Sequence, residues 1–331
     1  MRQTASDGFC GSLHEAVGTI AGRRCVAGAT IKRVSSFLFT RRMGFSLEDL
    51  LALLDLERIE HNIFRGQSVD IGSGSVYGGQ ALAQSLVAAR YTVGDDTRRA
   101  HSMHGYFILA GDVAAPIVYD VDRLRDGNSF ATRRIVAIQH GRAIFNMAAS
   151  FQSPEDGASH QTEMPDVPGP EGLTAELDLL RAIADRIPPK VRHFYTRERP
   201  IEVRPVDPVN PFDPAPTTPV SYRWLRTHGP MPDDPLLHQA VLAYASDYGL
   251  LGTALRPHGL SFVQPNLQLA SLDHAIWFHR PFRTDEWLLY AMDSPAADQA
   301  RGFTRGQIFA QDGTLVASVA QEGLMRVWED T

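Results

Sequence analysis

The chain has 331 residues, of which 44% are hydrophobic and 21% charged, and this composition suits a globular protein of one large or two medium domains. Its net charge of −6 argues against nucleic acid as a main partner, because phosphate binding needs a concentrated basic surface. No apolar run approaches the ~20 residues of a membrane span, so we expect a soluble protein without stable membrane insertion.

Residues 1–42 differ in composition from the rest, because they are rich in arginine and nearly free of acids. Both cysteines, Cys10 and Cys25, lie here, so the remainder has no thiol for disulfides, catalysis or metal binding. A reducing compartment, the cytoplasm, is therefore the default expectation. The segment is either a transit peptide or the product of an upstream start codon, with Met43 as the true start. In both cases we expect it to be poorly ordered.

Residues 43–155 form the first of two predicted units. A short amphipathic helix over 47–56 and a strand over 59–70 precede a glycine-marked turn and a helix at about 79–91. Runs rich in β-branched and aromatic residues then predict a meander of strands. These runs are 101–109, 117–124, 129–140 and 143–153.

Residues 156–200 are rich in proline and enclose one predicted helix, Leu173–Ile187, so they are interpreted as a linker. The second unit, 201–331, repeats the order of the first. Its predicted elements are a helix over 235–255 and strands over 267–278, 286–292, 302–311 and 315–327. One helix against a long antiparallel sheet, present twice, predicts an α+β architecture.

The two long helices align over residues 80–88 and 239–247, and only the second copy carries an acid. Ala88 ends the first segment and Asp247 ends the second. The neighbours of Asp247 at helical spacing are largely apolar, and partial desolvation by them would perturb its pKa. A lone helix aspartate is more often a solvated residue, so the asymmetry alone does not assign a role.

Several blocks of the sequence are long and unusual. They are Phe64-Arg65-Gly66-Gln67, Gly78-Gly79-Gln80, Arg125-Asp126-Gly127-Asn128-Ser129-Phe130, Tyr244-Ala245-Ser246-Asp247, Asp273-His274-Ala275-Ile276-Trp277-Phe278-His279-Arg280-Pro281-Phe282 and Ala300-Arg301-Gly302-Phe303. Together they closely resemble the acyl-CoA thioesterase II family, from about Met43 to Arg326. The resemblance implies a double hot-dog fold: two tandem units that each wrap an antiparallel sheet around a central helix, with the sheets side by side.

The resemblance also implies a catalytic set in the second unit. The family's aspartate falls on Asp247, its glutamine on Gln321, and its threonine on Ser271, where serine keeps the hydroxyl and loses the methyl group. The first unit has Ala88 and Ala149 at the positions of Asp247 and Gln321, so we expect it to be a non-catalytic copy and each chain to hold one active site.

The residues present favour direct attack by water on a thioester. No Gly-x-Ser-x-Gly elbow occurs, and no cysteine lies outside the leader, so a covalent route has little support. A carboxylate can activate the water while neighbouring polar groups position it. The resulting hypothesis is hydrolysis of fatty acyl-CoA to free fatty acid and CoA, with Asp247 as base, Ser271 and Gln321 positioning, and neither metal nor organic cofactor.

Histidines are the main competing candidates. His101 and His104 stand three residues apart on a predicted strand, where this spacing points side chains to opposite faces and disfavours a metal pair. Structural or surface roles are expected for these two and for His274 and His279. His101 is the best candidate outside the family set for a residue near the thioester.

Two other functional classes stay open on the sequence. Hot-dog proteins include (3R)-hydroxyacyl-CoA hydratases and dehydratases, which use a histidine with an aspartate or glutamate, and a non-catalytic acyl-CoA-binding module is the second alternative. The edges of hot-dog sheets commonly associate, so a homo-oligomer, a dimer or tetramer, is expected. Five arginines are candidates to meet CoA phosphates, although solvated strand positions fit most of them: Arg125, Arg133, Arg280, Arg301 and Arg305.

Overall fold

The structure, a computed structural model, describes residues 44–72 and 74–328. The predicted leader, with Cys10, Cys25 and the alternative start at Met43, lies outside these residues. Over the described part of the chain, no helix is long and apolar enough to cross a membrane.

The first unit begins with α1 (Leu47–Leu54), which Ser46 and Asp49 cap reciprocally. The strand expected over 59–70 is instead a hairpin, β1 (Glu57–Glu60) and β2 (Ile63–Gly66), in which Glu57 pairs with Arg65. The unit then continues as predicted, with one long helix and a meander. These elements are α2 (Gly78–Arg90), β3 (Arg99–Phe107), β4 (Ile117–Asp126), β5 (Phe130–Gln139) and β6 (Arg142–Gln152).

The linker holds two α-helices and two 3₁₀ turns, so the prediction of a single helix there was wrong. The turns are η1 (Pro170–Gly172) and η2 (Ala184–Arg186), and the helices are α3 (Glu176–Ala182) and α4 (Pro189–Thr196). Proline disfavours helical backbone at the residue before it, so Pro188 and Pro189 separate the two helices. Pro189 then opens α4 at a first-turn position, where its missing N–H costs nothing.

The second unit repeats the meander, but its long helix is broken. Its elements are β7 (Ile201–Pro205), β8 (Val220–Thr227), α5 (Pro235–Ser246), α6 (Leu250–Leu255), η3 (Arg256–His258), β9 (Leu267–Ser271), β10 (Asp273–Phe278), β11 (Leu288–Asp298), β12 (Arg301–Ala310) and β13 (Leu315–Val327). The helix predicted over 235–255 is interrupted at Asp247–Gly249, where Gly249 has a φ of 78°, a left-handed conformation that favours glycine.

Within the described residues, the strands form a single thirteen-stranded sheet. Its order is β1-β2-β4-β5-β6-β3-β10-β13-β12-β11-β8-β7, with β9 paired to β13. The two units meet where β3 runs antiparallel to β10, with Tyr106 opposite Asp273 and Ser102 opposite Trp277. The α+β prediction of two tandem units with sheets side by side is therefore confirmed.

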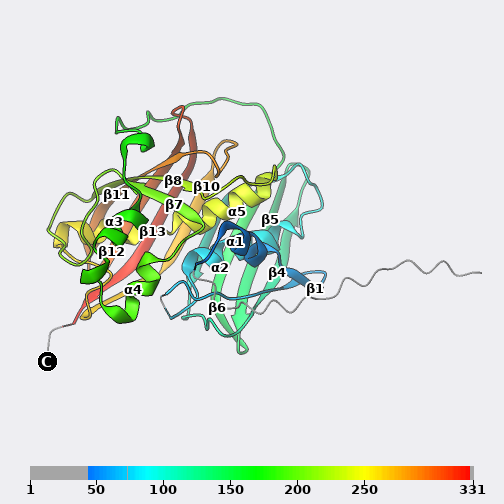
Figure 1. Cartoon of the computed structure of the whole chain (residues 1–331). Helices are drawn as coiled ribbons and strands as arrows, with labels where there is room; N and C mark the ends of the chain where they lie inside the picture. The colour runs from blue at the N-terminus through cyan, green and yellow to red at the C-terminus, as the bar shows by residue number, and fades with distance from the viewer. Residues whose placement is uncertain (1–43, 73, 329–331) are drawn as a thin grey trace, which may run out of the picture. The chain divides into compact units, whose positions relative to one another are not determined.

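The central helices α2 and α5 pack against each other and against the sheet (Figure 1). Nearly all residues of both helices are buried, and their apolar side chains contribute to one core that includes residues of both units. The approach is close at Gly79, where an added Cβ would lie 2.3 Å from the carbonyl oxygen of Tyr244. The first turn of α2 therefore lies against the last turn of α5.

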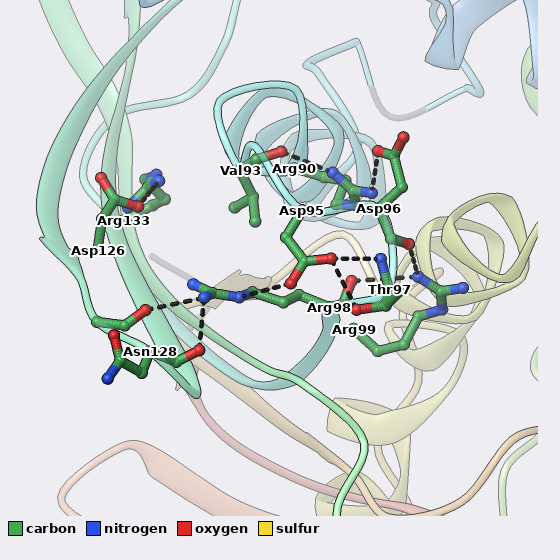
Figure 2. Close-up of polar contacts among 11 residues, drawn as sticks. Arg90, Val93, Asp95, Asp96, Thr97, Arg98, Arg99, Asp126, Asn128 and Arg133 are labelled. Atoms are coloured by element: carbon green, nitrogen blue, oxygen red, sulfur yellow. Dashed lines mark hydrogen bonds and ion pairs between the residues drawn. The ribbon is translucent and has the colours of Figure 1, made fainter.

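Arginines fix the other end of α2 (Figure 2). Arg98 donates to the carbonyl oxygens of Gly127 and Asn128, both at 2.8 Å, and so holds the β4–β5 turn. Arg133 is fully buried and donates to the Thr92 hydroxyl at 2.7 Å and to the Thr92 carbonyl oxygen at 3.1 Å. Arg133 was a sequence candidate for CoA phosphates or a solvated strand position, and its burial contradicts both interpretations.

Candidate active site

Asp247 lies at the C-terminal end of α5, at the break before α6. It is half-buried beside a cluster of three tyrosine rings from Tyr77, Tyr244 and Tyr248, whose centroids lie 5.0 to 5.7 Å apart. Burial, and after it the charge of Asp247, raises the pKa of Tyr77 well above its ordinary value. The carboxyl group therefore stands in a largely aromatic surrounding.

Burial raises the pKa of Asp247 to about 7. Two hydrogen bonds oppose this rise, the first from the backbone N–H of Gly79 at 3.1 Å and the second from the Gln321 side chain. A carboxyl group in this balance exchanges its proton near neutral pH, which is the property needed in a general base.

The N–H that reaches Asp247 comes from the first unit. Gly79 is in the first turn of α2, whose N-cap residue Tyr77 provides no side-chain cap. The positive end of the helix dipole therefore points at the carboxylate. At Gly78 an added Cβ would lie 2.7 Å from Asp247 Oδ2, so only glycine fits without a shift of the acid. A backbone donor of this kind is not predictable from the sequence, in which only the Gly78-Gly79 pair marks the position.

Gln321 and Ser271 lie on neighbouring strands. Gln321 is in β13 and is 1% exposed, and its Nε2 donates to Ser271 Oγ at 2.6 Å. Ser271 ends β9, which pairs with β13 near this point. The structure thus brings together all three residues proposed from the sequence, because Gln321 contacts both Ser271 and Asp247.

His274 is the residue of this site that sequence analysis did not assign to it. It is fully buried in β10, with Nδ1 2.9 Å from Gln321 Oε1 and Nε2 2.9 Å from Ser246 Oγ. Burial lowers its pKa to about 4, so the imidazole is neutral near pH 7. The available signal was strand alternation, which places His274 and Ile276 on the same face of β10.

The other histidines lie apart from this cluster of hydrogen bonds. His101 packs edge-on against Phe130, with ring centroids 5.6 Å apart, and His104 is exposed and lies 3.1 Å from Asp273. His279 lies 2.9 Å from Ser318 Oγ. In residues 44–72 and 74–328, no group of three or more His, Cys, Asp or Glu side chains could hold a metal ion.

A cavity of about 560 Å³ begins next to the candidate base. Tyr248 and Gly249, the two residues after Asp247, belong to its wall. Residues of α3, α4, α6, β7 and β8 line part of the rest, loop residues within 207–215 and 259–263 line much of the remainder, and most of this lining is apolar. The linker helices therefore help to enclose a space large enough for an organic ligand.

Comparison with known proteins gives matches over nearly all of the described chain. An acyl-CoA thioesterase N-terminal domain model matches residues 67–152, and an acyl-CoA thioesterase model matches residues 190–324. The chain is 44% identical to acyl-CoA thioesterase 2 of Haemophilus influenzae over 287 residues, which cover 87% of this chain and 100% of that protein. It is 40% identical to human acyl-coenzyme A thioesterase 8 over 283 residues, which cover 83% of this chain and 88% of the human protein.

Solved structures agree with these matches. The acyl-CoA thioesterase II of Mycobacterium marinum is 42% identical, with a TM-score of 0.69 and coverage of 86% of this chain and 99% of that one. A protein with a hot dog fold from Alicyclobacillus acidocaldarius is 19% identical, with a TM-score of 0.67 and coverage of 84% of this chain and 98% of that one, and shows the fold alone. The chain therefore belongs to the acyl-CoA thioesterase II family of double hot-dog thioesterases.

Proposed function

We propose that the protein hydrolyses fatty acyl-CoA to free fatty acid and CoA by direct attack of water, with Asp247 as general base. The observation that carries the proposal is a half-buried carboxyl group with a pKa of about 7 that accepts hydrogen bonds from Gly79 and Gln321. The names of the relatives, which are acyl-CoA thioesterases, support the substrate class.

In the proposed reaction, ionised Asp247 takes a proton from a water molecule while the water oxygen adds to the thioester carbonyl carbon. The tetrahedral intermediate then expels the thiolate of CoA as the C–S bond breaks, and the proton held by Asp247 neutralises the leaving group. Gln321, whose amide N–H groups reach Ser271 and Asp247, positions these two side chains, and the Ser271 hydroxyl is left free to donate to the water or to the developing negative charge. Positioned general-base catalysis contributes about 10²–10⁴-fold to such a step.

The cavity next to Asp247 is proposed to take the acyl chain. Its wall begins with Tyr248 and Gly249, so a thioester beside the base can direct its chain into this mainly apolar space of about 560 Å³. Ligand pockets of about 300–1,000 Å³ with predominantly apolar linings are usual for organic ligands of this size. The linker is then part of the substrate site as well as a connection.

We propose one active site per chain. Ala88 is fully buried in α2 and Ala149 is 1% exposed in β6, so the first unit has filled the two positions with small apolar residues. The hydratase alternative requires a histidine paired with a carboxylate, whereas His274 bonds to Ser246 and Gln321. The buried histidine of this site therefore lacks the carboxylate partner that the alternative needs, and His104, which does lie 3.1 Å from Asp273, is exposed.

Release of free thiol from palmitoyl-CoA tests the proposal. Asp247→Asn should lower kcat by about 10²-fold or more, because asparagine keeps the shape and removes the base. Asp55→Asn is the matched control: Asp55 ends α1 as Asp247 ends α5, but it is exposed, and its variant should keep the wild-type rate. Wild-type rates in Asp247→Asn would exclude it as the base. Binding of acyl-CoA by the wild-type protein without thiol release would favour a binding module instead.

A further inference from the structure

His274 connects the two elements that carry the proposed base and the proposed amide. Its Nε2 lies 2.9 Å from the hydroxyl of Ser246, which directly precedes Asp247, and its Nδ1 lies 2.9 Å from Gln321 Oε1. Building on the proposed function, we propose that His274 is a positioning residue whose Nδ1–H tautomer orients the Gln321 amide, so that the amide N–H groups face Ser271 and Asp247.

The hydrogen atoms available on Ser246, His274 and Gln321 allow two arrangements of hydrogen bonds. A neutral imidazole carries one N–H, and a serine hydroxyl carries one O–H. In the first arrangement, Nδ1–H donates to Gln321 Oε1 and the Ser246 hydroxyl donates to Nε2. In the second, Nε2–H donates to the Ser246 hydroxyl, and the Gln321 amide turns over so that its N–H meets the bare Nδ1.

The surroundings of Gln321 favour the first arrangement. Its Nε2 lies 2.6 Å from Ser271 Oγ, and its side chain also donates to Asp247. The second arrangement would place the amide oxygen against an ionised carboxylate, which repels it. A buried amide at 1% exposure has no bulk water to compensate such a mismatch. The position of one histidine proton therefore decides which end of the Gln321 amide faces Ser271 and Asp247.

On the far side of His274, the single O–H of Ser246 has two acceptors within reach. Ser246 Oγ lies 2.9 Å from both the Ala243 carbonyl oxygen and His274 Nε2. The Ser246 hydroxyl donates to the Ala243 carbonyl oxygen in the structure, so when Nδ1 carries the imidazole proton this hydroxyl turns to the bare Nε2 and ties the last turn of α5 to β10. Since Gln321 and His274 are neighbours across the β10–β13 pair, the contact also fixes the base relative to β13.

Two substitutions show whether His274 orients Gln321 or only packs in the core. Asparagine places an amide nitrogen near the position of Nδ1, whereas glutamine places one near Nε2. His274→Asn should keep kcat within about ten-fold of wild type, and His274→Gln should lose about 10²-fold, the usual effect of one lost positioned donor, with KM nearly unchanged. His238→Gln is the control, because His238 is also buried and bonds to Thr284 away from the site.

A double variant shows whether His274 acts through Gln321. His274→Gln introduced into Gln321→Ala should cause no further loss of kcat, because the amide to be oriented is already absent. If the losses of kcat in the two single variants multiply in the double variant, the positioning role of His274 is wrong. Equal losses of kcat in His274→Asn and His274→Gln would also contradict it. Neither result would contradict the proposed hydrolysis. Wild-type rates in Gln321→Ala would contradict the proposed function itself, and this proposal with it.

The tautomer can be read directly on the folded wild-type protein. In ¹⁵N-histidine-labelled protein near pH 7, His274 should show a protonated Nδ1 and a bare Nε2, with its signals assigned by their loss in His274→Asn. This measurement does not depend on the stability of any variant. A protonated Nε2 with a bare Nδ1 would overturn the proposal.

Discussion

The ionised form of Asp247 is disfavoured by its half-buried, aromatic surroundings and favoured by the Gly79 N–H and the Gln321 side chain. Burial outweighs both donors, so the carboxyl group titrates near pH 7. The residue therefore combines a substantial ionised fraction with a strong affinity for the proton of water.

The first prediction concerns the pH dependence of the rate. Only the carboxylate can accept a proton, so kcat/KM should fall as pH drops below about 7, approaching ten-fold per pH unit, and reach a plateau above that pH. Thiol release between pH 5 and 9, with circular dichroism as a control for unfolding, measures this. A rate that stays flat down to pH 5 in folded protein would contradict the assigned base.

The second prediction concerns the hydroxyl at Ser271. Ser271→Thr keeps the oxygen that meets Gln321 Nε2 and should retain kcat within a few-fold, whereas Ser271→Ala should lower it by roughly ten-fold or more. Both variants are compared with wild type by kcat and KM for the same acyl-CoA. Equal activity of Ser271→Ala and wild type would remove the hydroxyl from the mechanism.

At the residue scale, sequence resemblance selected Asp247, Ser271 and Gln321, and the structure places them together. His274 could not be assigned from sequence, because a histidine in an apolar strand reads as a core residue. Its contacts depend on the register between β10 and β13, which sequence does not give. The contribution of Gly79 was missed for a similar reason, since a backbone N–H leaves no side-chain signature.

At the scale of elements, the approach of α2 to α5 decides the geometry of the site. The absence of side chains at Gly78 and Gly79 lets the first turn of α2 reach both the acid and the backbone of α5. The two glycines face different neighbours, so they can be tested separately.

The third prediction uses this difference. At Gly79 a methyl group would meet the Tyr244 carbonyl oxygen at 2.3 Å, and Gly79→Ala should destabilise the fold by about 1–3 kcal/mol despite the better helix propensity of alanine. At Gly78 the group met is the Asp247 carboxylate, at 2.7 Å, so Gly78→Ala should mainly reduce kcat. Denaturant unfolding and thiol release are measured on both variants, with Gly94→Ala as the control, because an added Cβ at Gly94 meets no atom within 4 Å. If Gly78→Ala proves the less stable variant and Gly79→Ala the less active one, the assignment of the two contacts is wrong.

The break between α5 and α6 shows the limit of sequence patterns at this scale. Apolar residues continue through 240–255, so periodicity predicts one helix, and an isolated glycine inside a helical pattern is tolerated. Only the φ of 78° at Gly249 reveals the interruption. The break places Asp247 at a helix end, where its carboxyl group can turn toward α2 instead of lying along a continuous helix.

At the scale of the described part of the molecule, one apolar core and one sheet join both units, so an unfavourable interaction at one residue lowers the free energy of unfolding of the whole fold. The buried charge of ionised Asp247 is such an interaction. Its folded pKa lies above its unfolded value, so the folded state holds a proton that the unfolded state has released, and stability falls as pH rises toward 7.

The fourth prediction follows from this linkage. Asparagine resembles the protonated acid, so Asp247→Asn should unfold at higher denaturant than wild type at pH 8, and by less at pH 5. The difference in the free energy of unfolding between variant and wild type should be roughly 2.7 kcal/mol larger at pH 8 than at pH 5, from about two pH units at 1.36 kcal/mol each. A variant no more stable than wild type at pH 8 would show that the site does not disfavour the charge.

The two tandem units were predictable at this scale, because the same turns and strand order appear twice in the sequence. The pairing of β3 with β10, which joins the units, was not predictable. Alternating apolar residues mark β3 and β10 as strands, but which edges meet depends on how both units pack around α2 and α5. The division of the linker into two helices likewise depended on a proline pair rather than on periodicity.

The pairing of β3 with β10 has a consequence for how such a protein can change. In an assembly of identical subunits, one codon substitution alters every copy of a site at once. Here the two copies are encoded separately and yet joined by continuous backbone hydrogen bonds. The first copy has Ala88 and Ala149 where the second has Asp247 and Gln321, but a side chain at its Gly78 would lie 2.7 Å from the acid of the second copy. A substitution in one repeat can therefore leave its twin unchanged, whereas a substitution at Gly78 in the first repeat acts directly on the second.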